Sequence, residues 1–213
     1  PNTIAVHAST SGPMNSRWYT GGGLFRDVNL ITTPADIYFA RHPLFVTTRD
    51  NHLVDLQIEV ANYTKRNDIK LRTTIADQQG NIVYDKTADM HFNRKMRTNE
   101  LKWETIDIAE PKLWSCETPH LYTATVTILD DNGNETDRTS TRFGIRTIEI
   151  GPDFGLKVNG KKVLLKGIAN HHTLGALGAA AYPRAMEKRI QMLRDFGFNH
   201  IRTSHNPYST SFL

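Results

Sequence analysis

The sequence contains one cysteine, Cys116, among its 213 residues, so no disulfide can form within the chain. A single thiol fits a reducing compartment and a large periplasmic enzyme equally well, which leaves the localisation open between cytoplasm and periplasm. No apolar run approaches the roughly 18 residues that a membrane-spanning helix needs. Basic and acidic residues, 26 and 22 of them, are mixed along the chain. We therefore expect a soluble protein without membrane insertion and without a nucleic-acid partner.

Residues 1–33 are too few to bury a core alone. They contain Arg17-Trp18-Tyr19 and a run of three glycines, and the alternating stretch at residues 24–30 predicts a short strand. This segment is expected to be the tail of a preceding β domain, or an arm lying on the next one. Pro34 marks the predicted boundary.

From about residue 36 to residue 146, apolar and polar residues alternate with a period of two, which is typical of strands with one buried face. The clearest such stretches are residues 54–60, 69–75, 101–108 and 122–128. The segments 77–81 and 130–134 supply the Asp, Asn and Gly residues that hairpin turns favour. About seven short strands in roughly 110 residues predict an immunoglobulin-like β-sandwich.

Trp103 and Trp114 admit two interpretations. Exposed, they would serve a carbohydrate-binding or adhesion module. Buried, they would be core or interface aromatics. We favour the second interpretation, because Trp103 follows the same alternation as Leu101 and large aromatic side chains are mostly buried.

After residue 150 the pattern changes to strand, helix and strand. Asn159-Gly160 predicts a hairpin turn, and the apolar run that continues to Ile168 predicts a buried strand. Pro183 then opens a helix, which Gly197 ends. Its apolar face is predicted to consist of Met186, Ile190, Leu193 and Phe196. Residues 198–203 supply the second strand.

A strand, a crossover helix and a second strand in one sheet are almost always parallel, so both strands end at the same edge. His171 and His172 follow the first strand, and Arg202 and His205 come at the end of the second. Parallel α/β folds and barrels gather their chemistry at this edge. We therefore infer a functional site there.

The residue types at this edge favour recognition over covalent or metal chemistry. Ser204 lacks the Gly-x-Ser-x-Gly elbow of a nucleophile, and Cys116 lies in the predicted sandwich. Zinc binding by His171 and His172 is a weaker alternative, because adjacent residues point to different faces and no third ligand follows at the usual spacing. No metal or cofactor is expected. Arg, His and Asn side chains are good donors to hydroxyls and carboxylates, the groups that a sugar-cleaving site must hold.

With these residues the chain resembles glycoside hydrolase family 2, which contains β-galactosidases, β-glucuronidases and β-mannosidases. Five groups of residues carry the resemblance, and they occur in the family's order. They are Arg17-Trp18-Tyr19 with residues 23–28, residues 111–115 with 119–122, Phe143-Gly144-Ile145-Arg146, Leu165-Lys166-Gly167-Ile168 with His171-His172, and residues 201–207.

The resemblance implies three parts. Residues 1–33 are the C-terminal tail of a jelly-roll sugar-binding domain, residues 34–147 an immunoglobulin-like β-sandwich, and residues 148–213 the N-terminal portion of a (β/α)8 barrel catalytic domain. The expected fold class is mainly β, a sandwich followed by the first βαβ part of a TIM barrel.

The resemblance also implies a retaining exo-β-glycosidase with one glutamate as acid/base and another as nucleophile. Between residues 167 and 213 the only carboxylates are Glu187 and Asp195, both on the predicted crossover helix. Both catalytic glutamates are therefore expected beyond Leu213, so the chain is expected to be an inactive fragment on its own. The sequence leaves open whether the whole enzyme forms a homo-oligomer.

By resemblance, His171 and His205 hydrogen-bond the hydroxyls of the terminal sugar, Arg202 orients the ionised nucleophile, and Asn206 forms part of the pocket wall. The stretch 172–178 most resembles β-galactosidases, which makes a β-galactoside the favoured carbohydrate substrate. A β-glucuronidase or β-mannosidase fragment is the alternative within the family. Outside it, the alternatives are a non-catalytic carbohydrate-binding or adhesion sandwich and a structural spacer.

Overall fold

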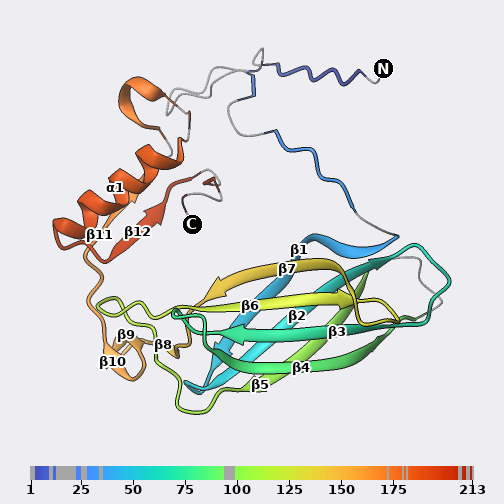
Figure 1. Cartoon of the computed structure of the whole chain (residues 1–213). Helices are drawn as coiled ribbons and strands as arrows, with labels where there is room; N and C mark the ends of the chain where they lie inside the picture. The colour runs from blue at the N-terminus through green and yellow to red at the C-terminus, as the bar shows by residue number, and fades with distance from the viewer. Residues whose placement is uncertain are drawn as a thin grey trace. The chain divides into compact units, whose positions relative to one another are not determined.

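The computed structural model describes most of the chain, which divides into two compact units. The described residues are 3–9, 12, 23–24, 28–33, 36–93, 99–171, 173–178, 180, 182–205, 208–209 and 212. One unit is Ile31–Val163, and the other joins Pro1–Leu30 to Leu164–Leu213. Figure 1 traces both units along the chain.

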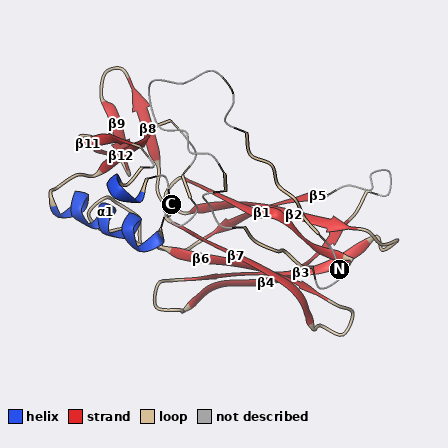
Figure 2. Ribbon diagram, turned by 90° about the horizontal axis from the view of Figure 1, so that it is seen from above, coloured by secondary structure: helices blue, strands red, loops and turns tan. Residues whose placement is uncertain are grey.

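The larger unit contains a two-layer sandwich of seven antiparallel strands, which confirms the predicted immunoglobulin-like fold. One sheet has the order β1-β2-β5 and consists of β1 (Ile37–Arg49), β2 (Leu53–Asn62) and β5 (Glu100–Asp107). The other has the order β4-β3-β6-β7 and consists of β3 (Asp68–Ala76), β4 (Ile82–His91), β6 (Tyr122–Leu129) and β7 (Glu135–Phe143). Figure 2 shows the two sheets as stacked layers.

The hydrophobic core lies between the two sheets and is built from alternate residues of each strand. From β2 it takes Val54, Leu56, Ile58 and Val60, none of which has exposed surface. Strands β3 and β6 contribute their own alternating apolar residues from the opposite layer. The period of two in the sequence therefore identified the buried faces of these three strands correctly.

Strand β5 departs from the predicted pattern. The side chain of Trp103 is 66% exposed and that of Leu101 is 49% exposed, so the core interpretation of Trp103 is wrong. These residues lie on the outer face, and the alternating positions Glu104 and Ile106 face inward. The Glu104 carboxylate accepts hydrogen bonds from the Tyr84 hydroxyl at 2.8 Å and from the Thr73 hydroxyl at 3.0 Å. Two partners from the other sheet thus compensate a partly buried charge.

A small three-stranded sheet of order β10-β9-β8 follows the sandwich. Its strands are β8 (Ile148–Gly151), β9 (Gly155–Val158) and β10 (Lys161–Lys162). Asn159 and Gly160 join β9 to β10 with φ values of 51° and 73°, which confirms the predicted hairpin turn. The prediction of a buried strand running on to Ile168 is wrong, because Leu164 and Leu165 are 72% and 49% exposed and lie outside any strand.

The smaller unit contains a β-strand, a helix and a second strand. Strands β11 (Gly167–Asn170) and β12 (His200–Thr203) pair in parallel, as predicted, and helix α1 (Pro183–Asp195) connects them after a short 3-10 turn, η1 (Gly175–Leu177). Gly197 ends the helix with a φ of 83°. Met186 is buried, whereas Phe196 is 80% exposed just beyond the last turn. The prediction that Phe196 belongs to the buried face of the helix is therefore wrong.

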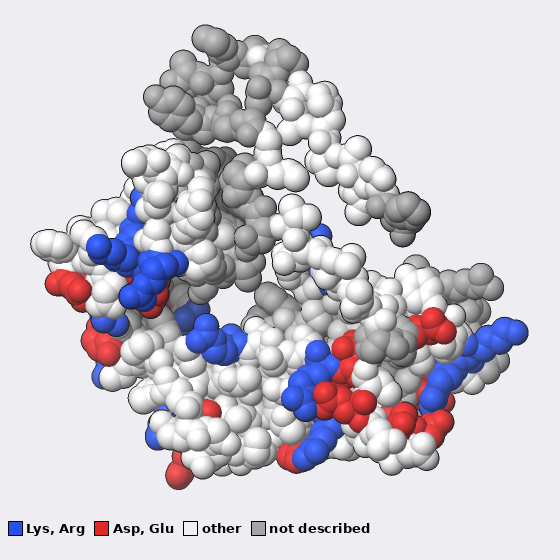
Figure 3. All heavy atoms as spheres, turned by 45° about the horizontal axis from the view of Figure 1, so that its top comes forward, with Lys and Arg blue, Asp and Glu red and all other residues white. Residues whose placement is uncertain are grey.

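The N-terminal motif Arg17-Trp18-Tyr19 lies outside the described residues. Residues 28–33 have no regular secondary structure, so the predicted strand at residues 24–30 is not found in its described part. None of the described helices has the length and apolar character needed to cross a membrane. On the face drawn in Figure 3, Lys and Arg side chains lie beside Asp and Glu side chains rather than forming a uniform basic field.

Candidate functional site

The candidate site lies at the carboxyl end of the two parallel strands. Their register aligns Gly167 with His200 and Ala169 with Arg202. A Cβ atom at position 167 would lie 2.7 Å from the backbone oxygen of His200, so a glycine is required for the strands to approach this closely. The Leu-Lys-Gly-Ile motif therefore has a local steric function in placing β12, which carries Arg202.

Arg189 of α1 fixes the segment that follows β11. Its guanidinium donates to the side-chain oxygen of Asn170 at 3.1 Å, to the backbone oxygen of His171 at 2.9 Å and to that of Thr173 at 2.6 Å. A planar guanidinium with several donors suits such a set of oxygens. The backbone around His171 is thus held by the helix.

The same contact shows on which face of the sheet Arg202 lies. Because the Asn170 side chain bonds to α1, this face of β11 is the one covered by the helix. Side chains alternate along a strand, so Ala169 lies on the opposite face. Arg202 is the in-register partner of Ala169 and shares that face, and its side chain is exposed. In a closed barrel, the face opposite the helices becomes the interior.

The two histidines of the predicted site come together. The rings of His171 and His205 meet edge to face with 5.6 Å between their centroids. The Ser204 amide donates to the backbone oxygen of Asn170 at 2.9 Å, and the peptide bond between Ser204 and His205 is cis. Asn206 and His172 lie outside the described residues. The structure thus brings together His171 and His205, from the ends of both strands.

Tyr208 ties the chain after His205 back to the first strand. Its hydroxyl donates to the backbone oxygen of Asn170, and its side chain is buried. Burial raises the pKa of Tyr208, which keeps the hydroxyl protonated as a donor.

The carboxylates among the described residues of this unit have structural contacts on the helix. Glu187 accepts from Arg184 at 2.8 Å, and Asp195 accepts from Gln191 at 2.7 Å, all on α1. Among the described residues, no group of three His, Cys, Asp or Glu side chains could hold a metal ion.

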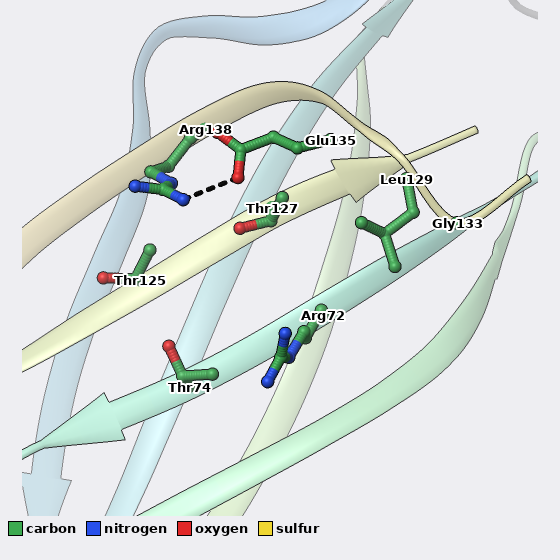
Figure 4. Close-up of a pocket in the computed structure, with 8 residues that line it drawn as sticks. All are labelled: Arg72, Thr74, Thr125, Thr127, Leu129, Gly133, Glu135 and Arg138. Carbon is green, nitrogen blue, oxygen red and sulfur yellow. Dashed lines mark hydrogen bonds and ion pairs between the residues drawn. The ribbon is translucent and has the colours of Figure 1, made fainter. Parts of the chain in front are cut away.

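Hollows also occur on the larger unit, and two of them are lined by described residues of the sandwich and of the β9–β10 hairpin. One, of about 370 Å³, lies over β3, β6 and β7, and Figure 4 shows it lined by threonines and two arginines. Arg138 pairs with Glu135 at 2.6 Å, and Arg72 pairs with Asp85 at 2.6 Å. Both guanidinium groups are thus already neutralised. The other hollow, of about 560 Å³, includes Cys116 and the β9–β10 hairpin.

Comparison with known families now identifies the chain. The model described as "Glycosyl hydrolases family 2" matches residues 40–146, and "Glycosyl hydrolases family 2, TIM barrel domain" matches residues 152–213. The chain belongs to glycosyl hydrolase family 2. The sandwich and the parallel strand pair are therefore the immunoglobulin-like domain of this family and the start of its TIM barrel.

Similar proteins of this family are much longer. The chain is 32% identical to Beta-galactosidase BoGH2A of Bacteroides ovatus over 218 residues, which is 100% of this chain and 25% of that protein. A family 2 member from Bacteroides cellulosilyticus has 34% identity and a TM-score of 0.85 over 96% of this chain and 28% of its own. A Bacteroides uniformis beta-glucuronidase, at 21% identity, shares the fold with a TM-score of 0.82, covering 96% of this chain and 26% of its own. The chain thus spans about a quarter of each.

Sequence reasoning missed the residues that position the site. Arg189, Asn170 and Tyr208 were not among its candidates. The sequence does contain a hint of the role of Arg189. This charged residue lies three positions after Met186, on the helix face that is otherwise apolar. Such a charge requires polar partners, and here these are the oxygens after β11.

Proposed function

We propose that this chain is part of a retaining β-glycosidase and that the carboxyl ends of β11 and β12 form one wall of its sugar-binding site. The observation that carries the proposal is the meeting of His171 and His205 at 5.6 Å, at the strand end where Arg202 also lies. Imidazole and guanidinium donors suit sugar hydroxyls and carboxylates. Family membership supplies the reaction class.

In this proposal each residue has its own role. His171 and His205 hydrogen-bond the hydroxyls of the terminal sugar, and Asn206 adds a wall to the pocket. Arg202 orients the nucleophilic carboxylate and holds it ionised, because a neighbouring cation favours the charged form. Arg189 acts indirectly by holding the backbone of His171 in place.

The two catalytic carboxylates of a retaining enzyme stand about 5–5.5 Å apart on either side of the bond that breaks. Glu187 and Asp195 do not suit this task, since both lie on α1, the helix side of the sheet. We propose that both glutamates come from sequence beyond Leu213.

The domain limits at residues 33 and 147, with a jelly-roll tail before the sandwich, belong to the same proposal.

A β-galactoside is the proposed substrate. The similar protein of Bacteroides ovatus is named a beta-galactosidase, and its similarity extends over the whole chain. A β-glucuronide is the second candidate within the family, because a structure of the same fold is a beta-glucuronidase.

The test is steady-state kinetics of a protein that carries this chain together with the rest of a family 2 enzyme. Hydrolysis of nitrophenyl β-D-galactoside and β-D-glucuronide is compared for the parent protein and for the variants His205→Ala and Arg202→Ala. Each variant is expected to lower kcat/KM about a hundredfold, since each removes a donor from a developing charge or a sugar hydroxyl. The matched control is Arg194→Ala, an exposed arginine of α1.

Two results would overturn the proposal. Equal kcat/KM values for Arg202→Ala and Arg194→Ala would remove Arg202 from the site. Hydrolysis by the 213-residue chain alone, at a rate typical of an enzyme, would place both carboxylates within it. A higher kcat/KM for the glucuronide than for the galactoside would change only the proposed substrate, from a β-galactoside to a β-glucuronide.

A further inference from the structure

An exposed aromatic row crosses the outer face of the β1-β2-β5 sheet. The register pairs Phe45 with Gln57 and Gln57 with Trp103, so the three side chains lie side by side on the three strands. Phe45 is 61% exposed and Trp103 is 66% exposed. Isolated exposed apolar residues are ordinary, but two large rings aligned in one row of a sheet indicate a surface with a binding function.

The spacing of the two rings follows from sheet geometry. Neighbouring strands lie about 4.8 Å apart, so side chains on β1 and β5 that share one row are about 10 Å apart, with Gln57 between them. The aromatic row (Phe45, Gln57 and Trp103) is thus a flat, extended platform with an amide at its centre. An amide both donates and accepts hydrogen bonds.

Carboxylates border the aromatic row on both sides, and the half-exposed Leu101 lies opposite Glu59. On one side, Asp55 accepts from the Arg49 guanidinium at 2.8 Å and from the Thr105 hydroxyl at 2.6 Å. On the other side, Glu59 accepts from the Asn99 amide at 2.6 Å. These contacts hold two carboxylates in place beside the rings, with acceptor capacity remaining on their oxygens.

We propose that this face binds an extended glycan chain, with Trp103 and Phe45 stacking on sugar rings and the bordering groups bonding to hydroxyls. A sugar ring has an apolar face of C–H groups and a rim of hydroxyls, which matches exposed aromatic rings with a carboxylate on either side. The proposal goes beyond glycoside cleavage, because it assigns sugar binding to the sandwich itself.

The charges on this face favour a neutral glycan over other occupants. Glu59 would repel the phosphates of a nucleic acid, and the ion pair with Asp55 neutralises Arg49 beside the row. A protein partner covering the row would have to bury both carboxylates, whereas the cores of protein interfaces are depleted in charged residues. Sugar hydroxyls, in contrast, donate hydrogen bonds to carboxylates and cost no charge burial. A neutral polyhydroxylated chain therefore fits this face best.

The test is affinity electrophoresis of the 213-residue chain in native gels that contain soluble β-1,4-galactan or hydroxyethyl cellulose. We expect at least one of the two glycans to retard the chain. Trp103→Ala is expected to weaken binding about tenfold, the loss that removal of one anchoring aromatic gives. Phe45→Ala is expected to act in the same direction. Phe196→Ala, which removes an even more exposed ring (80%) from the other unit, is the control and should leave the retardation unchanged.

Further variants and measurements keep the outcomes distinct. Circular dichroism and thermal melting establish that each variant is folded, and Trp103→Phe should restore much of the retardation. If Arg202→Ala weakens the retardation as much as Trp103→Ala does, the binding belongs to the proposed barrel site and the proposal for this surface fails. The proposal is overturned by absence of retardation in both gels, by equal retardation of Trp103→Ala and the parent, or by self-association that depends on Trp103 without glycan binding.

Discussion

Arg189 and Asn170 connect helix α1 to strand β11 through a hydrogen bond of 3.1 Å between a guanidinium nitrogen and the side-chain oxygen of Asn170. Asn170 is almost fully buried, so its oxygen has little access to water as an alternative donor. The same guanidinium bonds to the backbone after the strand. One side chain therefore determines where His171 is held.

Replacing Arg189 by Met should loosen the segment after β11. The change removes three hydrogen bonds from a charged donor, and such bonds contribute about 2 kcal/mol each when their acceptors are shielded from water. We expect faster amide hydrogen exchange in residues 168–174, measured by mass spectrometry, while the sandwich is unaffected. Arg194→Met is the control, because its side chain is 72% exposed. Equal exchange in both variants would show that Arg189 does not hold this segment.

Gly167→Ala should separate the two parallel strands. The new methyl group would lie 2.7 Å from the backbone oxygen of His200, which cannot turn away as a side chain can. Overpacking of this kind costs about 1–3 kcal/mol. The expected result is loss of amide protection in residues 199–204.

Gly151→Ala is the matched control for that experiment. A Cβ atom there would meet the end of the Phe154 ring at 2.6 Å, and this side chain can rotate away. If both alanine variants protect the amides of residues 199–204 equally, the close approach at Gly167 is not what sets the strand spacing.

Glu104→Ala should destabilise the sandwich. The change removes the acceptor from the Tyr84 hydroxyl and from the Thr73 hydroxyl, and Thr73 is only 2% exposed. A buried donor left unsatisfied costs about 1–3 kcal/mol. Urea unfolding should therefore show a lower midpoint, with a smaller decrease for Glu104→Gln, which keeps one acceptor oxygen. Glu149→Ala, on the exposed strand β8, serves as the control. A urea midpoint of Glu104→Ala as high as that of Glu149→Ala would contradict the prediction.

The strands of the sandwich were predictable from sequence because each has one buried face. In β2 the residues Val54 to Val60 are buried alternately, and no other assignment of faces gives a core. Strand β5 was not predictable in the same way. Hydrophobicity places Trp103 inside, but Glu104 faces inward because its partners Tyr84 and Thr73, 20 and 31 residues away in sequence, offer it hydrogen bonds.

At the candidate site, the order of predicted strands and helix located the sheet edge where the site lies. It did not identify the contacts that hold this edge in place. A parallel crossover brings the ends of β11 and β12 together by topology, so His171, Arg202 and His205 could be grouped from their positions alone. The contacts of Arg189 depend on where α1 packs on the sheet, which no local pattern specifies. The burial of Leu164 and Phe196 was predicted wrongly, because the apolar character of a residue does not show which other residues would cover it.

Stability at acid pH should depend on two turns with the same hydrogen-bond pattern. In the segments 77–81 and 130–134, the aspartate accepts from the side-chain amide of the asparagine four residues later, and also from backbone amides. These bonds, led by that of the asparagine side chain, lower the pKa of Asp77 and of Asp130 below the ordinary value of 3.8. The folded state therefore binds protons less readily than the unfolded state does.

It follows that the stabilisation from these turns is complete above pH 3.8 and is lost as the pH falls further, through the lowered pKa values. Urea unfolding at several pH values between 7 and about 2.5 should show a decrease in unfolding free energy only at the acid end. The double variant Asp77→Asn with Asp130→Asn should be less stable at neutral pH and should lose less on acidification, since neither site titrates. Asp153→Asn, in the turn between β8 and β9, is the control. An acid decrease of the same size in the double variant and in this control would assign the effect to other carboxylates, such as Asp55 beside Arg49.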